Sequence, residues 1–377
     1  MLDSVASPAQ DIRELLRLLA EKGGSDMFLS TGALPHAKID GLTQPISGQR
    51  LTPGVVRQMA YQLMNEEQIV EFERELEMNL AVGIAEIGRF RLNVFLQRGE
   101  VSMVVRYVRN QIPALASLNL PAAMEKLALL DRGLILVVGS AGSGKSTTLA
   151  SLLDHRNSRI SGHIVCVEDP IEFVHHHKRS VVDQREVGLD THSYAAALRN
   201  VLREAPDVIM LGEIRDQETM QHALHYSETG HLCVATLHAT SSIQAIERIV
   251  HFFPESARKQ ILNDLALNLV GIVAQRLVPG LQQSRVLAAE LMLNTPHLRD
   301  LIKRDELHEL KDAMARAIEQ GVQTFDEHLY EHFCAGRINL EQALKHADSR
   351  TDLSLKIKLE RGFGDDLGSA SVFDHEL

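Results

Sequence analysis

The stretch Gly139-Ser140-Ala141-Gly142-Ser143-Gly144-Lys145-Ser146 decides the fold of this chain. It fits G-x-x-x-x-G-K-[ST], the pattern of a phosphate-binding P-loop. The apolar run 134–138 before it is typical of a buried parallel strand, and residues 147–153 after it are typical of a helix. This context argues against a glycine-rich turn that binds nothing, and it predicts a nucleotide-binding α/β domain.

Each part of the loop has a predicted task. The glycines let the backbone turn its N–H groups inward around phosphate oxygens, and the N-terminus of the following helix adds partial positive charge. Lys145 is expected to reach the β- and γ-phosphates, and the Ser146 hydroxyl is expected to bind Mg²⁺. The stretch from Gly139 to Thr147 is therefore the predicted site for a nucleoside triphosphate.

The composition disfavours several classes of protein. The chain has 377 residues, 45% of them apolar, and a net charge of −11. Its length predicts two or three domains. The acidic balance and the lack of a long basic block disfavour nucleic acid as a partner. Cys166, Cys233 and Cys334 lack a C-x-x-C spacing, which argues against a zinc ribbon and fits a reducing compartment. We expect Cys166 and Cys233 to be small core residues.

The sequence predicts no integral membrane segment. Residues 1–4 carry neither the basic start nor the apolar run of a signal peptide. The most apolar long window, 265–274, falls short of the ~20 residues that a bilayer crossing needs. We therefore expect a soluble protein, and a peripheral membrane location stays open.

Residues 1–110 are predicted to form a small α+β domain. Apolar residues at helical spacing predict a helix over 11–22. The other expected elements are strands at 27–29 and 36–39, a helix from Pro53 to about Val70, and strands within 79–109, among them 88–95 and 102–107.

The rest of the chain is predicted to follow in four parts. Residues 111–121 contain two prolines and little periodicity, so we interpret them as the interdomain linker. Over 122–290 apolar strand-like runs alternate with helical segments, which predicts a mostly parallel sheet with helices on both faces. Residues 291–359 are expected to be helical, and 360–377 to be a flexible acidic tail.

Acidic residues follow a predicted strand in the segment 164–173. Glu168, Asp169 and Glu172 lie at or beyond its carboxyl end. In open α/β sheets that edge is where ligands bind. A carboxylate there can orient an attacking water or hold the hydration shell of a metal.

A second predicted strand ends in acidic residues within the segment 202–216, as a Walker B element does. Gly212 stands at the usual aspartate position, so Glu213 is the main candidate for the Mg²⁺ shell. Since Mg²⁺ keeps several waters, this glutamate is expected to act through one of them.

Histidines stand out in two places. His238 ends the predicted strand within 230–239, where it can hydrogen-bond a γ-phosphate. Taken alone, however, a histidine at a strand end is more often structural. The run 175–177 consists of three histidines, but three adjacent residues do not easily converge on one ion. We therefore expect that run to be a solvent-facing loop.

Together these segments resemble the secretion-superfamily hexameric ATPases that drive type II secretion and type IV pili. Residues 202–216 fit the family pattern [LIVM]-R-x-x-P-D-x-[LIVM]₃-G-E-[LIVM]-R-D throughout. The segment 168–172 resembles the family's Asp box, and 236–238 resembles its His box. The resemblance implies a PAS-like first domain, a RecA-like second domain, and ATP with Mg²⁺ as cofactors. It also implies that Glu172 activates water, that Glu213 supports Mg²⁺ and that His238 contacts the nucleotide region.

Within this superfamily the chain is most similar to the pilus retraction branch, PilT and PilU. Residues 22–29 resemble that branch's opening K-x-G-x-S-D-L-H-L, with Phe28 in place of the usual histidine. The tetracysteine module of assembly and export members is excluded by the three scattered cysteines. The segment 297–304 keeps only part of the PilT motif A-I-R-N-L-I-R-E, which favours PilU.

The resemblance implies a motor that works with partners. The family assembles as a ring of six, here a homohexamer at the cytoplasmic side of the inner membrane. The implied partners are a PilT-type motor ATPase and a PilC-like platform protein in that membrane. Arginines of the first domain would approach the phosphates as the site closes, and Arg91, Arg106 and, less strongly, Arg98 are the candidates.

Three other interpretations remain. The chain could be a full PilT-type motor, which the segment 297–304 argues against. It could be a nucleotide-binding scaffold that stabilises a partner ring and hydrolyses little, which Lys145, Glu172 and Glu213 argue against. A conjugation or DNA-transport ATPase fits the acidic balance poorly.

Overall fold

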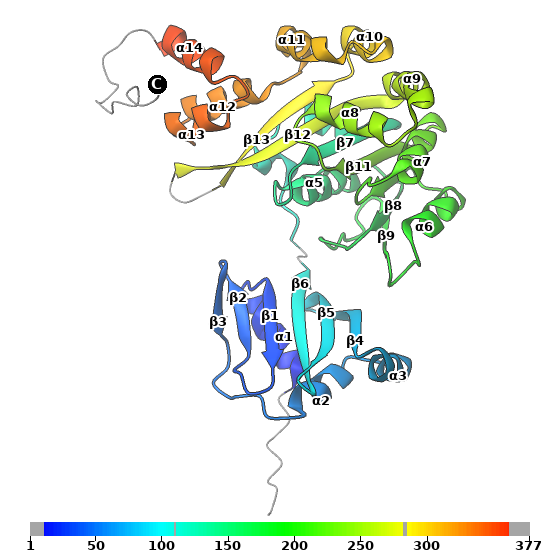
Figure 1. Cartoon of the computed structure of the whole chain (residues 1–377), viewed down its shortest axis with the longest axis vertical. Helices are drawn as coiled ribbons and strands as arrows, with labels where there is room; N and C mark the ends of the chain where they lie inside the picture. The colour runs from blue at the N-terminus through cyan, green and yellow to red at the C-terminus, as the bar shows by residue number, and fades with distance from the viewer. Residues whose placement is uncertain (1–10, 109–110, 282–284, 362–377) are drawn as a thin grey trace, which may run out of the picture. The chain divides into compact units, whose positions relative to one another are not determined.

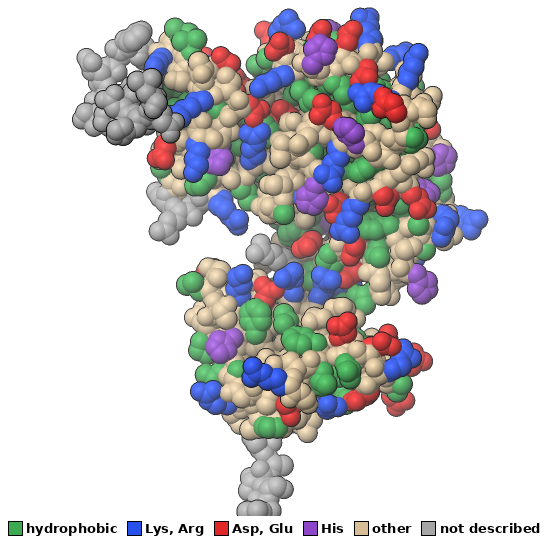
Figure 2. Space-filling model, in the orientation of Figure 1, with side chains coloured by type: hydrophobic (Ala, Val, Ile, Leu, Met, Phe, Trp, Pro, Cys, Tyr) green, Lys and Arg blue, Asp and Glu red, His purple; other side chains and the backbone are tan. Residues whose placement is uncertain are grey.

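The computed structural model describes residues 11–108, 111–281 and 285–361. The chain divides into two compact units. The first unit comprises residues 1–112 and 165–204, and the second comprises residues 113–164 and 205–377. On the face shown in Figure 2, acidic and basic side chains are interspersed over both units.

The N-terminal part of the first unit is a six-stranded antiparallel sheet with the strand order β3-β2-β1-β6-β5-β4 (Figure 1). The strands are β1 (Asp26–Ser30), β2 (His36–Ile39), β3 (Leu42–Pro45), β4 (Glu77–Ile84), β5 (Gly88–Gln97) and β6 (Glu100–Val108). The expected strands at 27–29, 36–39, 88–95 and 102–107 are thereby confirmed.

The sheet has one apolar face because its strands alternate. On β5, Phe90, Leu92 and Val94 are buried, while the side chains between them are only partly covered. Helix α1 (Ile12–Glu21) contributes its buried apolar side to the same hydrophobic core, which confirms the helix expected over 11–22. The polar face of β5 and β6 is thus left for charged residues.

The single helix expected from Pro53 to Val70 is wrong. The structure has two helices there, α2 (Val55–Tyr61) and α3 (Glu66–Glu75). Asn65 accepts a hydrogen bond from the Gln68 N–H at 2.8 Å, and the Asn65 N–H donates to Gln68 Oε1 at 3.0 Å. This reciprocal capping box starts a new helix where a continuous one was expected.

The second segment of the first unit consists of two strands, an irregular loop and a helix. They are β8 (His163–Glu168), whose first two residues are counted with the second unit, the loop 169–180, β9 (Val181–Glu186) and α6 (Tyr194–Val201). The solvent-facing loop expected at 175–177 is wrong for His175, which is buried and donates its backbone N–H to Gln184 Oε1 at 2.8 Å. His176 and His177 are exposed.

The second unit contains the P-loop. Five strands of its sheet are neighbours in the order β13-β12-β7-β11-β10 (Figure 1). β7 (Gly133–Gly139) pairs in parallel with β11 (Leu232–Leu237) and β12 (Leu269–Pro279), and β10 (Val208–Leu211) pairs in parallel with β11. β13 (Arg285–Leu293) pairs with β12 in antiparallel fashion, so the sheet is mixed.

Helices make up the rest of the second unit. After the last strand they gather beside β12 and β13, drawn in orange and red in Figure 1. The helices of this unit are α4 (Ala123–Ala128), α5 (Lys145–Asn157), α7 (Gln217–Glu228), α8 (Ser242–His251), α9 (Arg258–Asn268), α10 (Pro296–Arg304), α11 (Leu310–Arg316), α12 (Phe325–Cys334), α13 (Leu340–His346) and α14 (Arg350–Arg361). Across the described ranges, every helix is too short or too polar to cross a membrane.

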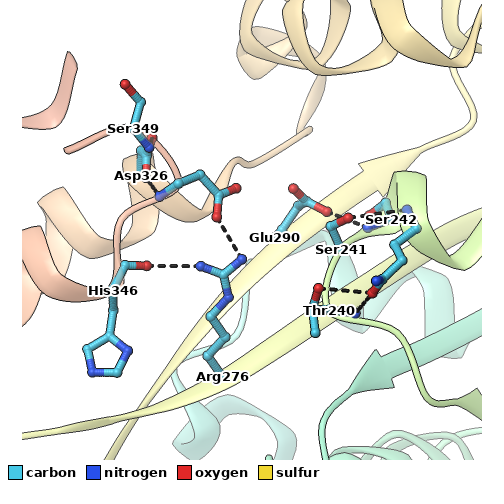
Figure 3. Close-up of polar contacts among 10 residues, drawn as sticks. Thr240, Ser241, Ser242, Arg276, Glu290, Asp326, His346 and Ser349 are labelled. Carbon is cyan, nitrogen blue, oxygen red and sulfur yellow. Dashed lines mark hydrogen bonds and ion pairs between the residues drawn. The ribbon is translucent and has the colours of Figure 1, made fainter. Parts of the chain in front are cut away.

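Arg276 on β12 ties the last helices to the sheet (Figure 3). Its guanidinium lies 2.6 Å from the Asp348 carboxylate and donates to the His346 carbonyl at 2.9 Å. It also lies over the Phe325 ring, 3.7 Å from the centroid. Asp326 accepts hydrogen bonds from the N–H groups of Asp348 and Ser349, so the segment before α14 is held from two sides.

A buried pair of histidines fixes α12 on β13. His328 Nδ1 accepts from the Ala289 N–H at 2.9 Å, and His332 Nε2 donates to the Leu287 carbonyl at 2.9 Å. The two rings lie 4.2 Å apart. Burial, together with His332 and Arg337, lowers the pKa of His328 to about 4. Both rings are therefore neutral parts of the core.

The three cysteines differ in exposure. Cys166 and Cys233 are fully buried in strands, which confirms the expected core positions, and burial raises the pKa of both thiols. Cys334, the last residue of α12, is exposed.

Candidate active site

The P-loop of the second unit has the shape that its sequence predicts. Gly144 has a φ of 91°, a conformation that side chains rarely adopt, and α5 begins at the next residue. A Cβ on Gly139 would lie 2.8 Å from the Gln275 carbonyl oxygen, so the close approach of β12 also requires glycine.

The side chain of Lys145 folds back onto the P-loop that precedes it. Its Nζ donates to the carbonyls of Gly139 and Ser140, at 2.9 Å each. Burial lowers the pKa of this ammonium, and the charge of Glu213 acts in the opposite direction. In the structure the ammonium thus meets neutral carbonyl oxygens, which a phosphate can replace as stronger partners.

The loop fits a bound phosphate group. α5 has no side-chain hydrogen bond at its N-cap, which leaves its first N–H groups to an anion. The Ser146 side chain is accessible at the start of this helix, where a hydroxyl ligand to Mg²⁺ is expected. These donors, together with Lys145, are the set that a nucleotide with Mg²⁺ requires.

Gln275 supports the P-loop from the neighbouring strand, and the sequence reasoning missed it. It is almost fully buried on β12, and its Nε2 donates to the Ser143 carbonyl at 3.2 Å. The parallel register of β12 with β7 places Gln275 opposite Gly139. Because that pairing joins positions more than a hundred residues apart, no local motif marked it.

Glu213 and His238 meet at the ends of two neighbouring parallel strands. His238 Nε2 lies 2.8 Å from Glu213 Oε1, and Arg215 Nε lies 2.6 Å from Glu213 Oε2. Thr236 links the same ends, because its hydroxyl donates to the Gly212 carbonyl at 2.5 Å. The structure thereby brings Glu213 and His238 together, and it adds Arg215, which the sequence reasoning did not single out.

The loop 169–180 of the first unit leaves the Glu172 side chain exposed to solvent. Glu172 is exposed, while its neighbours Ile171 and Phe173 are buried. Glu168, at the end of β8, is buried and accepts a hydrogen bond from Gln184 Nε2 at 2.8 Å. Burial raises the pKa of Glu168 to about 7. The two carboxylates therefore have different environments, and Glu172 is the one that a water molecule can reach.

Arg91 and Arg106 lie opposite each other on β5 and β6. Arg106 Nε is 2.8 Å from Asp26 Oδ1, and Arg91 Nε is 3.0 Å from Glu186 Oε1. Both arginines line one cavity of about 500 Å³, together with Asp169. The structure thus groups the two strongest arginine candidates within the first unit.

Two other arginines of this sheet do not line the cavity that Arg91 and Arg106 share. Arg98 lies in the turn between β5 and β6, at the far end of the strands from Arg91, and it is exposed. Arg89, which the sequence reasoning passed over, is 3.2 Å from Glu186, but it lines a different cavity from Arg91. Strand alternation is the signal that could have found Arg89, because it shares a face with Arg91.

Comparison with known proteins gives consistent matches. The sequence profile of the family described as "Type II/IV secretion system protein" matches residues 38–345. The Pseudomonas aeruginosa protein named "Type IV pilus ATPase PilU" is 49% identical over 97% of this chain and 94% of its own length. The P. aeruginosa protein named "Type IV pilus retractation ATPase PilT" is 38% identical over 89% of this chain and 98% of its own length.

A solved structure has the same fold. The crystal structure of "the Pilus Retraction Motor PilT and Bound ADP" superposes with a TM-score of 0.85 at 41% sequence identity. The match covers 92% of this chain and 99% of that one.

Proposed function

The chain belongs to the family of type II/IV secretion system proteins, and on that basis we propose that it is an ATP-hydrolysing motor protein of type IV pilus retraction and twitching motility. The observation that carries the proposal is the arrangement of Lys145, Glu213 and His238 in the second unit. A P-loop lysine and a carboxylate–histidine pair follow neighbouring parallel strands there, as nucleoside triphosphate hydrolysis requires.

The residues have distinct tasks in this proposal. The segment from Gly139 to Thr147 holds the phosphates, and Lys145 leaves the loop carbonyls for the β- and γ-phosphates. Ser146 would hold Mg²⁺ directly and Glu213 would hold it partly through water, and the ion would supply positive charge beside the phosphates. His238, held by Glu213, faces the γ-phosphate.

In this proposal the first unit supplies the general base and the arginines that bind the phosphates when the site closes. Glu172 orients a water molecule and takes its proton as the water oxygen bonds to the γ-phosphorus; the products are ADP and phosphate. Arg91 and Arg106 exchange their carboxylate partners for phosphate oxygens, which guanidinium groups bind in a bidentate manner. This exchange would make closure depend on bound nucleotide.

We also propose the finer architecture and the partners. The domains are a PAS-like module (1–110), a linker (111–121), a RecA-like core (122–290) and a helical region (291–359), of which β13 takes the first residues up to Leu293. The tail predicted over 360–377 lies outside the described residues except at its start, where α14 runs to Arg361. The protein would act as a homohexamer at the cytoplasmic face of the inner membrane. The similarity to PilU supports a role beside a PilT-type motor, acting on a PilC-like platform protein.

Turnover measurements test the proposal. Purified protein is assayed for Mg²⁺-dependent ATP hydrolysis beside Glu172→Gln, with the oligomeric state read by light scattering. We expect hexamers that hydrolyse ATP and a loss of at least about 10²-fold in Glu172→Gln, the lower end of the range for a general base. Nucleotide binding with equally low turnover in both proteins would reject the motor and leave the scaffold interpretation.

A further inference from the structure

The side chain of Gln184 makes three hydrogen bonds to the segment from the end of β8 into the loop that follows it. Its Nε2 donates to Glu168 Oε1 and to the Phe173 carbonyl, at 2.8 Å each. Its Oε1 accepts from the His175 N–H, also at 2.8 Å. Gln184 therefore bonds the chain on both sides of Glu172.

These contacts use both N–H donors of the amide group and one acceptor position of its oxygen, in a fixed orientation. A backbone carbonyl only accepts and a backbone N–H only donates, so Phe173 and His175 determine which end of the amide is nitrogen. The two donors and the acceptor of Gln184 each have a partner. A glutamine in this position is thus specified by its three partners and not by size alone.

Glu168 extends the same network to Glu172 itself. The backbone N–H of Glu172 donates to the Glu168 carboxylate. Ile171 and Phe173 are buried on either side, with 3% and 8% of their surface exposed, so the loop is fixed while Glu172 stays outside. The buried carboxylate of Glu168 therefore holds the backbone of the exposed one.

From this network we infer that Gln184, acting with Glu168, is a positioning residue that holds Glu172 in place for attack by water on ATP. The inference rests on the function proposed above. Gln184 meets neither water nor phosphate in this role; it acts through the backbone of the loop. A catalytic group displaced by about 1 Å can lose on the order of 10²-fold in rate, which is the scale expected here.

The first test is Gln184→Met, which keeps the length of the side chain and removes all three hydrogen bonds. We expect kcat to fall by about 10- to 100-fold, whereas KM for ATP changes less than about threefold because the P-loop belongs to the other unit. Gln260→Met is the matched control, since Gln260 is exposed on α9 and its side chain donates to Asp264, one turn along the same helix. An unchanged kcat in Gln184→Met would overturn the inference.

A double-mutant cycle separates positioning from a general structural effect. If Gln184 acts through Glu172, the Gln184→Met change adds little to the loss already present in Glu172→Gln, as measured by single-turnover hydrolysis. Full multiplication of the two losses would contradict the inference. Absence of hydrolysis in the unmodified protein would instead reject the proposed function, so the two failures are distinguishable.

Gln184→Glu is the second variant, in case Gln184→Met folds poorly. It keeps the acceptor for His175 but places a carboxylate against Glu168, with Glu172, Glu186 and the guanidinium of Arg89 also nearby. We expect kcat to recover as the pH falls and one of the paired carboxylates takes a proton. A pH profile parallel to that of the unmodified protein would count against positioning by Gln184.

Discussion

His238 and Glu213 are in direct contact, 2.8 Å apart, although they follow two different strands. Each strand is buried along its length, so the backbone just before each residue is anchored in the sheet. A change of charge or shape at one of them is therefore felt by the other.

Replacing Glu213 by glutamine is expected to separate binding from hydrolysis. The amide keeps the size of the side chain but removes the charge that acts on Lys145 and that the proposed function assigns to the Mg²⁺ shell. We expect kcat to fall by about 10²-fold, with ATP affinity lowered less than tenfold, because the P-loop donors remain. Binding of a fluorescent ATP analogue and steady-state turnover check this; an equal loss in both would contradict it.

Arg91 and Arg89 can be compared directly, because both contact the carboxylate of Glu186. Both lie within hydrogen-bonding reach of Glu186, but only Arg91 shares a cavity with Arg106. Lysine cannot reproduce the bidentate geometry of arginine. Arg91→Lys is therefore expected to lower kcat by about 10-fold or more, and Arg89→Lys by less than about twofold. Similar losses in the two variants, measured under saturating ATP, would place the effect at Glu186 instead.

Stability is expected to fall in acid because of His328. Its pKa of about 4 lies below the ordinary 6.5, so the unfolded chain binds more protons than the folded one between these values. The contribution of His328 to folding stability is fully present above pH 6.5 and is lost as the pH falls toward 4. Urea midpoints at pH 7 and pH 5 should differ less in His328→Gln than in the unmodified protein.

The contribution of Glu168 to stability changes with pH in the opposite direction to that of His328. The pKa of Glu168 is raised to about 7, so the folded state binds the additional proton between pH 4.5 and 7. That stability is present below pH 4.5 and is lost as the pH rises through 7. Glu168→Gln should therefore enlarge the fall in urea midpoint from pH 7 to pH 5, whereas a smaller fall would show that His328 and Glu168 have been assigned incorrectly.

Arg276→Met is expected to loosen the last helices without unfolding the sheet. The change removes the contacts to Asp348 and His346 but keeps an apolar side chain against Phe325. Hydrogen exchange should rise by at least about threefold over α13 and α14, because their tie to β12 is lost, and stay unchanged in β7. Equal acceleration in β7 would indicate global destabilisation.

The sequence predicted best where the evidence was local. The P-loop could be recognised because eight consecutive residues specify it. Glu213 and His238 could be found because each lies within two residues of the end of an apolar strand. Gln184 and Gln275 could not be found from the sequence, since loop shape and strand register determine which residues they contact. The break at Asn65 was missed because apolar periodicity continues across a cap that depends on Gln68.

The contrast among the cysteines has a practical consequence. A maleimide dye reacts with an accessible thiolate, so in the native protein it should attach at Cys334 and leave Cys166 and Cys233 unmodified. The natural chain thus carries its own labelling position at the end of α12. Fluorescence from that position could follow the helices held by Arg276 during turnover, without engineered cysteines.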